Sequence, residues 1–494
     1  MATRPLRKTV LATAATGAIL ALLGSSVALG APHLAAAIHR VVTRVAAGGT
    51  SHPPTPAEPG PATDWTSYGG GLGNTFANPT SPLSAATAPT LHMAWFAPAP
   101  GEVSSNPIAS GNQVFFGSYD GSVQAVARDT GNLLWRATLD GSPIDGGMLL
   151  DGGTLFAATS GGKVVAMDPA TGQVKWTSAN LLGGLKDALR ASPVAYGGVI
   201  YESLGGTDDD LNEQGGVVAL DEQTGRVLWR TMLVNYDGGG AAVFSPPAVI
   251  PQLGELVVAT GNPTPFPGNA AADGDVPAGS DPESDSLVAL SLQGGQILWS
   301  TQTLAHDGND DDFIGAPNVV TLAGGTVAVG DGSKSGAYYL MNAATGRDLW
   351  HADLNLPGQQ TLIVATAAAA GGRIFVGTMD VDPNGQWPAN YQAPGTGRLV
   401  ALDQQTGKVL WSEALPGSLA AAPVVGNGVV MALAADGQLL AVDAATGARL
   451  SQQQAPGEVW NAEAALSLAG GTLLVPLADP GGVADYTLDA AGPS

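Results

Sequence analysis

Three short segments of the sequence carry the side chains best suited to acid–base or cation chemistry. Asn262 stands before Pro263, an acidic run extends from Asp307 to Asp312, and Lys334 lies among glycines and serines as one of few lysines. Carboxylate and amide oxygens are the ligands that calcium prefers, a carboxylate can accept a proton, and an ammonium group can stabilise negative charge. Each segment also has a plain structural interpretation: a turn at Asn262, a solvated loop at the acidic run and a surface turn at Lys334.

Composition excludes several other kinds of chemistry. The chain has no cysteine, which rules out disulfides, cysteine-bound zinc, covalently attached c-type haem and a lipoprotein anchor. Neither G-x-S-x-G nor H-E-x-x-H occurs, so nothing indicates a serine hydrolase or a zinc protease. After residue 48 the chain carries 14 basic and 42 acidic residues. Binding to a phosphate backbone needs clustered Lys and Arg, so we expect no nucleic-acid partner.

The N-terminus is typical of an exported protein. Three basic residues lie among the first eight, no acidic residue occurs before residue 48, and an apolar stretch follows from Val10 to Leu29. We predict that residues 1–31 are a secretory signal peptide or, alternatively, an uncleaved anchor that tethers the protein to the membrane. Residues 32–63, which become proline-rich from position 53, are predicted to be a linker. Both alternatives place residues 64–494 outside the cytoplasm.

One repeated unit must position the chemical residues. The unit is A-x-D-x-x-T-G-x-x-x-W, in which an apolar strand leads into a turn and a second strand returns to the tryptophan. Asp and Thr hydrogen-bond the backbone of such a turn, and Gly adopts its positive φ. The copies are Ala125–Trp135, Ala166–Trp176, Ala219–Trp229, Ala289–Trp299, Leu340–Trp350, Ala401–Trp411 and Ala441–Ser451. Trp95 is interpreted as the closing strand of an eighth unit.

These units predict an all-β, eight-bladed β-propeller. A second pair of strands precedes each motif, for example Gly198–Tyr201, and four strands per repeat are typical of a propeller blade. Successive tryptophans are 40 to 70 residues apart, so the longer repeats carry insertions, which fall between residues 177 and 411. The run Asp281–Asp285 in this region is predicted to be an exposed loop.

The repeat resembles the tryptophan-docking motif of pyrroloquinoline quinone (PQQ) dehydrogenases. The opening segment Asp64–Gly70 is also similar to the start of those domains, and the resemblance covers roughly residues 64–490. Within that family the chain looks most like the branch of polyvinyl-alcohol dehydrogenases. The resemblance implies PQQ and calcium as cofactors and oxidation of a small or polymeric alcohol as the activity. Because no haem domain follows, a separate electron acceptor such as a cytochrome c or a quinone is expected.

Residue roles follow from the same resemblance. The segment Gly261–Pro263 is similar to the one whose Asn binds calcium, which indicates Asn262. The acidic run and Phe313 resemble the stretch that carries the catalytic base, which indicates Asp312, also as a metal ligand. The segment Gly332–Gly336 resembles the one whose cation contacts the quinone, which indicates Lys334.

Three further residues are assigned where the sequence departs from the family pattern or matches it over a shorter stretch. Phe244 falls near the place of the aromatic residue that lies flat against PQQ. Thr207 stands at the position of the family's calcium-binding Glu, where Asp208 or Asp209 could substitute after a small shift, and Asp208 is assigned as the third metal ligand. Arg190 is assigned to the PQQ carboxylates. A rival interpretation remains open, in which the propeller has no cofactor and is a binding or assembly scaffold, since a fold does not fix a function.

Overall fold

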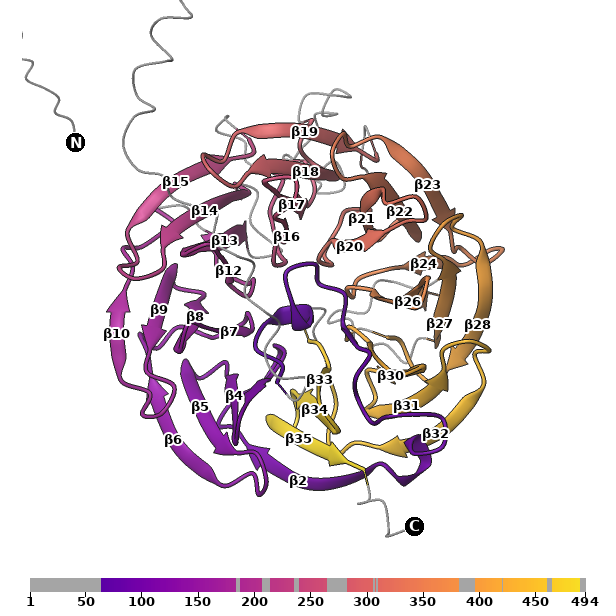
Figure 1. The fold of residues 1–494 in the computed structure, drawn as a ribbon, viewed down its shortest axis with the longest axis horizontal. Coiled ribbons are helices and arrows are strands. Elements are labelled where there is room, and N and C mark those ends of the chain that lie inside the picture. The colour runs from indigo at the N-terminus through magenta and orange to yellow at the C-terminus, as the bar shows by residue number, and fades with distance from the viewer. Residues whose placement is uncertain are drawn as a thin grey trace, which may run out of the picture. The chain divides into compact units, whose positions relative to one another are not determined.

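The described residues of this computed structural model form a closed ring of eight β-sheets (Figure 1). No α-helix occurs among them, and none of their helical segments is long and apolar enough to cross a membrane. The prediction of an all-β, eight-bladed propeller is therefore confirmed. The predicted signal or anchor segment and the linker lie outside the described part of the chain. The structure describes residues 64–183, 187–206, 214–234, 240–263, 282–304, 307, 310–381, 396–419, 421–459 and 464–488.

Each blade is an antiparallel sheet that runs from an innermost strand at the axis to an outermost strand at the rim. Blades 1 and 2 comprise β3 (Ile108–Ser110), β4 (Gln113–Gly117), β5 (Ser122–Ala127) and β6 (Leu133–Thr138), then β7 (Met148–Asp151), β8 (Thr154–Thr159), β9 (Lys163–Met167) and β10 (Val174–Thr177). Blade 3 comprises β11 (Asp187–Ala188), β12 (Val194–Tyr196), β13 (Val199–Gly206), β14 (Gly216–Asp221) and β15 (Val227–Met232). Blades 4 and 5 comprise β16 (Ala248–Ile250), β17 (Glu255–Ala259), β18 (Ser286–Ser291) and β19 (Ile297–Gln302), then β20 (Asn318–Thr321), β21 (Val327–Gly332), β22 (Ala337–Asn342) and β23 (Asp348–Asp353).

The remaining three blades follow the same plan. Blade 6 comprises β24 (Gln360–Leu362), β25 (Ala368–Ala370), β26 (Arg373–Val381), β27 (Thr396–Asp403) and β28 (Val409–Leu415). Blade 7 comprises β29 (Val424–Gly426), β30 (Val429–Leu433), β31 (Gln438–Asp443) and β32 (Arg449–Gln454), with the short β1 (Ala77–Asn78) parallel to β29. Blade 8 comprises β33 (Ser467–Ala469), β34 (Thr472–Leu477) and β35 (Gly482–Thr487) from the C-terminal end, and β2 (His92–Pro98) from the N-terminal end.

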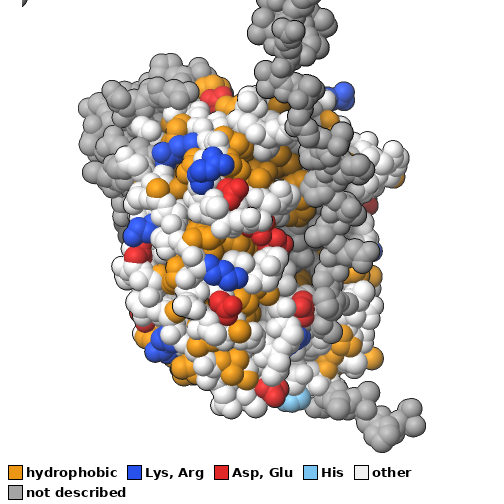
Figure 2. Space-filling view, turned by 60° about the vertical axis from the view of Figure 1, so that its left-hand side comes forward, with side chains coloured by type: hydrophobic (Ala, Val, Ile, Leu, Met, Phe, Trp, Pro, Cys, Tyr) orange, Lys and Arg blue, Asp and Glu red, His pale blue; other side chains and the backbone are white. Residues whose placement is uncertain are grey.

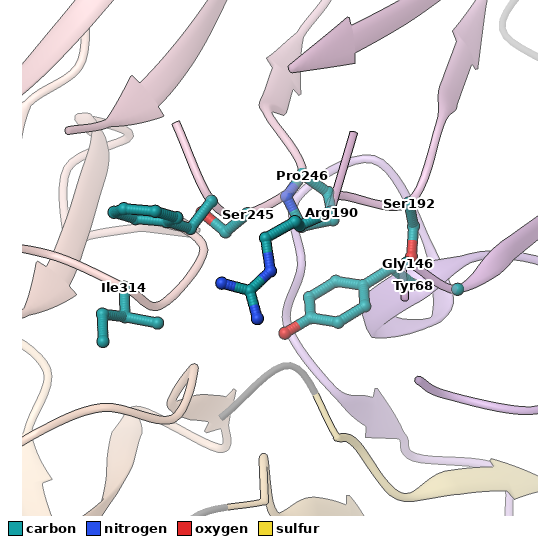
Figure 3. Close-up of a pocket in the computed structure, with 9 residues that line it drawn as sticks. Tyr68, Gly146, Arg190, Ser192, Ser245, Pro246 and Ile314 are labelled. Atoms are coloured by element: carbon teal, nitrogen blue, oxygen red, sulfur yellow. The ribbon is translucent and has the colours of Figure 1, made fainter. Parts of the chain in front are cut away.

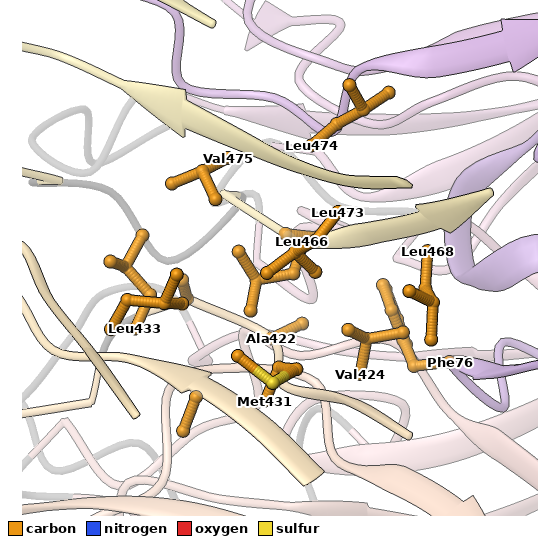
Figure 4. Close-up of a cluster of buried hydrophobic side chains, with 14 of the residues drawn as sticks. Phe76, Ala422, Val424, Met431, Leu433, Leu466, Leu468, Leu473, Leu474 and Val475 are labelled. Carbon is orange, nitrogen blue, oxygen red and sulfur yellow. The ribbon is translucent and has the colours of Figure 1, made fainter. Parts of the chain in front are cut away.

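The ring closes because the two ends of the propeller share blade 8. Strand β2 pairs antiparallel with β35, with Trp95 opposite Asp485, so the interpretation of Trp95 as part of an eighth unit is confirmed. The largest buried apolar cluster among the described residues extends from blade 6 through blades 7 and 8 to blade 1, and Figure 4 shows Met431 and Leu433 of blade 7 with Leu473 of blade 8 in this cluster. Burial of this apolar surface holds the first and last blades together.

The repeated tryptophans dock onto the turn of the next blade. In all seven cases the indole Nε1 donates to a backbone carbonyl of that turn at 2.7–3.2 Å. The turn glycine has a φ between 67° and 76°, and a Cβ built on it would lie 2.4–2.7 Å from the indole. The docked pairs are Trp95 with Gly131, Trp135 with Gly172, Trp176 with Gly225, Trp229 with Gly295, Trp299 with Gly346, Trp350 with Gly407 and Trp411 with Gly447. Gly is therefore required here for its backbone angle and for its lack of a side chain.

The eighth junction uses a smaller contact. Ser451 stands where the other motifs have tryptophan, and its Oγ donates to the carbonyl oxygen of Ala88 at 3.3 Å. Ala88 begins the 3₁₀ segment η3 (Ala88–Thr90), which takes the place of a blade turn just before β2. The degraded seventh motif therefore keeps a hydrogen bond to its neighbour although it lacks the indole.

The segment Asp64–Asn78, here called the axial clasp, joins the inner strands of most blades. Its 3₁₀ turn η2 (Tyr68–Gly70) lies at the centre of the ring in Figure 1. Its backbone carbonyls accept hydrogen bonds of 2.8–2.9 Å from residues of six blades: Ala109, Leu150, Val249, Val319, Ala369 and Val425. Asn78 adds a side-chain bond to the carbonyl of Leu468 in blade 8. The clasp thus ties seven of the eight blades to one short stretch of chain.

Two features of the surface concern the burial of one acidic segment and the distribution of charged side chains. The prediction of an exposed loop at Asp281–Asp285 is wrong for Ser284 and Asp285, which are each only 1% exposed because they lead directly into β18. On the outer face in Figure 2, hydrophobic side chains lie among isolated charged ones, and the Lys and Arg side chains of that face are scattered.

Candidate active site

Backbone pairing between two loops of blade 4 positions Phe244 and Asn262. The loop before β16 and the segment after β17 run alongside each other: Gly261 N donates to Ala242 O at 2.8 Å, and Ala241 N donates to Asn262 O at 2.9 Å. Gly261 leaves room for the two groups that flank it. A Cβ at this position would lie 2.8 Å from the Phe244 ring and 3.1 Å from Asp312 Oδ2. Both side chains therefore approach the same glycine.

Backbone contacts within blade 5 place Lys334 beside Asp312. Lys334 lies in the hairpin turn between β21 and β22, and its N–H donates to Asp312 O at 2.9 Å. Phe313 and Ser333 form an isolated antiparallel bridge at the same point. The loop before β20 is thereby fixed against the hairpin, and both side chains are almost completely buried, Asp312 at 1% and Lys334 at 4% exposure.

Four polar side chains form a connected network. Lys334 Nζ donates to Asp310 Oδ1 at 2.7 Å and lies 2.7 Å from Asp312 Oδ1. Asn262 Nδ2 donates to the same Asp310 oxygen at 2.8 Å. The other amide oxygen, Asn262 Oδ1, is buried and accepts no hydrogen bond from any described residue. The structure thus brings three sequence-predicted residues together and adds Asp310 between two of them.

Burial dominates the electrostatics of Asp312. The pKa of this carboxyl is raised to about 8, because removal from water, the largest cause, outweighs the lowering by the ammonium of Lys334, and the nearby Asp310 and Asp307 add smaller raising effects. A carboxyl whose pKa lies near neutrality can accept a proton and release it again at ordinary pH. This is the behaviour expected of a general base.

A small pocket adjoins this network on the side of Arg190. The loops that lead into the innermost strands of blades 2 to 5 contribute its walls, and the axial clasp contributes Tyr68. Figure 3 shows the Arg190 guanidinium in the middle of the pocket, beside the Tyr68 ring and across from Ile314. Phe244 belongs to the same wall, and Arg190 Nε lies 3.8 Å from Asp145 Oδ2. Arg190 and Phe244 therefore line one pocket.

Not every assignment is accounted for, and two residues were missed. Asp208 lies outside the described residues. Asp310 belonged to the recognised acidic run, but nothing in the sequence distinguished it from its neighbours. Its side-chain direction depends on a positive φ of 64°, which is uncommon for a non-glycine residue. Tyr68 stood in the recognised opening segment, but only the path of the clasp across the axis brings it to the pocket.

The residues present fit a bound cation and an anionic aromatic ligand in part. Asn262 Oδ1 and Asp312 supply buried oxygens of the kind that calcium binds, and Asn262 Oδ1 has no hydrogen bond among the described residues. Arg190 can pair with carboxylates, and Phe244 offers an aromatic face. Among the described residues, however, no group of three or more His, Asp or Glu side chains is placed to hold a metal.

Comparisons with known families agree with this architecture. A family model named PQQ_2, described as outer membrane protein assembly factor BamB, matches residues 79–179, 119–378 and 334–489. These stretches together cover most of the chain. The chain therefore belongs to this family of PQQ-type repeat propellers, and the resemblance inferred from the sequence is confirmed.

Individual relatives include both enzymes and an assembly factor. A polyvinylalcohol dehydrogenase from Sphingopyxis sp. is 26% identical over 80% of this chain and 68% of its own length. The quinoprotein alcohol dehydrogenase PedH from Pseudomonas putida is 24% identical over 71% of this chain and 59% of its own length. The assembly factor BamB from Yersinia pestis is 25% identical over 62% of this chain and 68% of its own length.

Solved structures show the same fold. The quinohemoprotein alcohol dehydrogenase of Comamonas testosteroni superposes with a TM-score of 0.74 over 89% of this chain and 82% of its own, at 18% identity. BamB from Moraxella catarrhalis superposes with a TM-score of 0.57 over 80% of this chain and 99% of its own, at 16% identity. At these identities the likeness concerns the fold alone.

Proposed function

We propose that the protein is an extracytoplasmic, PQQ- and calcium-dependent dehydrogenase that oxidises an alcohol. The observation that carries the proposal is the convergence of Phe244, Asn262, Asp312 and Lys334 at one point between blades 4 and 5, next to the pocket of Arg190. Relatives named polyvinylalcohol dehydrogenase and quinoprotein alcohol dehydrogenase support the reaction class. A small or polymeric alcohol would be the substrate.

The roles of the chain's own residues follow from their chemistry. Asp312 would take the proton of the alcohol hydroxyl, which its raised pKa allows. Lys334 would place positive charge where the electron-accepting group gains negative charge. Phe244 would support a flat ring, and Arg190 would pair with carboxylates. PQQ, when bound, would supply the two-electron acceptor for the hydride that leaves the alcohol carbon.

Calcium would be held by oxygen ligands from Asn262, Asp312 and Asp208. It would act as a Lewis acid toward the quinone oxygens. Electrons would then pass to a separate acceptor, such as a cytochrome c or a quinone. Export would depend on the N-terminal segment, either cleaved as a signal peptide or retained as a membrane tether.

Reconstitution tests this proposal directly. The purified chain is incubated with PQQ and calcium, and reduction of an artificial dye is followed with short alcohols and with polyvinyl alcohol. We expect alcohol-dependent reduction that Asp312→Asn abolishes. Asp311→Asn is the matched control, because it removes the neighbouring carboxylate of the acidic run, to which the proposal gives no role. Equal activity in Asp312→Asn and the unaltered chain would contradict the assignment of the base.

The second candidate is a scaffold without a cofactor. It is favoured by the BamB relatives and by the description of the matching family model. The absence of cysteine disfavours the lipid-anchored form of such a role. Failure of the purified chain to retain PQQ after gel filtration, at any calcium concentration, would support the scaffold instead of the enzyme.

A further inference from the structure

The ammonium of Lys334 already neutralises the carboxylates that a metal ion would need. Lys334 is 4% exposed, and a buried charge is stable only where opposite charge or hydrogen bonds surround it. Its Nζ lies 2.7 Å from an oxygen of Asp310 and 2.7 Å from an oxygen of Asp312. The positive charge is thus shared between two acidic side chains that would otherwise repel each other.

In this arrangement the ammonium of Lys334 would repel a divalent ion bound to Asp312. Calcium binds carboxylate oxygens at about 2.3–2.6 Å. An ion bound to Asp312 Oδ1 would therefore stand within a few ångströms of Nζ, which contacts the same oxygen. Two like charges at that distance repel strongly in a partly desolvated site. Calcium can bind Asp312 well only if the ammonium withdraws or if the repulsion is tolerated.

The rest of the site is ready to accept a cation. Asn262 is held in place because its Nδ2 donates to Asp310, and this orientation leaves Oδ1 buried without a hydrogen bond from any described residue. Asp310 is kept in position by a positive-φ backbone. When both carboxylates are ionised, Asp310, Asp312 and the charged Lys334 together carry one net negative charge, and without the lysine charge the site would carry two.

We propose that Lys334 is a built-in counter-ion that competes with calcium for Asp312 and thereby sets the calcium affinity of the site. In the calcium-free protein the ammonium keeps the two carboxylates together. Calcium binding must displace it from Asp312. The inference rests on the proposed function in one respect, since it assumes that calcium is the ion bound at this site.

Calcium titration of the full chain tests the competition without PQQ or activity. Calcium-stripped protein is titrated with calcium chloride in an isothermal titration calorimeter. We expect Lys334→Met to bind calcium at least tenfold more tightly than the unaltered chain, because one positive charge has been removed beside the ligand oxygen. Lys334→Arg retains the charge and should stay within about threefold of the unaltered chain. Asp312→Asn added to Lys334→Met should remove the gain.

The outcomes separate this inference from the proposed function. Equal calcium affinity in Lys334→Met and the unaltered chain, or no calcium binding by Lys334→Met, would overturn the competition. If circular dichroism shows that Lys334→Met is unfolded, Lys334→Gln, which is neutral but keeps a hydrogen-bond donor, is titrated with the same expectation. PQQ retention is measured separately by absorbance after gel filtration. A tenfold gain in calcium affinity without PQQ retention would support the competition and contradict the enzyme.

Discussion

The docking of tryptophan onto glycine makes a prediction that a matched pair of substitutions can test. Gly225 and Gly254 both have a φ of 68°, so alanine costs the same backbone strain at each. At Gly225 a Cβ would lie 2.5 Å from Cε3 of Trp176, whereas at Gly254 no atom lies within 4 Å. The difference between Gly225→Ala and Gly254→Ala therefore isolates the contact with the indole.

The expected magnitudes follow from the two physical effects. A left-handed conformation costs a non-glycine residue about 1–2 kcal/mol, and this cost lowers the stability of both variants. Overpacking a filled site costs about 1–3 kcal/mol more, and this second cost applies only to Gly225→Ala. We expect the free energy of unfolding to fall by about 1–2 kcal/mol in Gly254→Ala and by about 2–5 kcal/mol in Gly225→Ala. The latter range includes displacement of Trp176, whose Nε1 donates to Glu222 O at 3.1 Å.

Urea unfolding followed by far-ultraviolet circular dichroism measures these losses, with tryptophan fluorescence as an independent probe. Coincident transitions in the two signals justify a two-state treatment. Equal losses of stability in the two variants would refute the argument, because glycine would then be needed at the docking turn only for its backbone angle. A larger loss in Gly254→Ala would refute it as well.

Three further predictions concern the site and the buried acids. Asp312→Asn should lower kcat/KM for alcohol by roughly 10²–10⁴-fold in the reconstituted enzyme while PQQ retention persists, and loss of retention instead would assign Asp312 to binding. Phe244→Leu should weaken PQQ binding roughly two- to tenfold in a fluorescence titration, since an aromatic contact is worth about 0.5–1.5 kcal/mol, and unchanged affinity would exclude stacking on this ring. Burial raises the pKa of Asp331 to about 8, so the folded state retains a proton that the unfolded state loses above about pH 4, and stability should fall as pH rises from 4 to 8. Asp331→Asn should lose less stability over that range in urea titrations at pH 5 and pH 8, and parallel losses in both proteins would contradict the assignment.

Local sequence patterns were sufficient to predict the blades. The turn chemistry of Asp, Thr and Gly and the returning strand that ends in tryptophan are short-range features, and seven copies reinforced one another. Trp95 could be assigned to an eighth unit because a lone closing strand still carries the tryptophan. The burial of Asp285 could not be predicted in the same way, since an acidic, proline-containing run favours an exposed loop, and its burial depends on the strand that it enters.

The sequence by itself determined the repeat, the number of blades, the excluded chemistries and the segments in which the chemical residues lie. Tertiary structure alone decided that the ammonium of Lys334 bridges Asp310 and Asp312, and that Tyr68 reaches the pocket of Arg190. The physical reason is that these contacts join segments far apart in the sequence: the loop before β20 meets the β21–β22 hairpin of the same blade, and the axial clasp meets the loops of other blades. Their geometry depends on ring closure and on the φ of single residues. Neither of these produces a periodic pattern in the sequence.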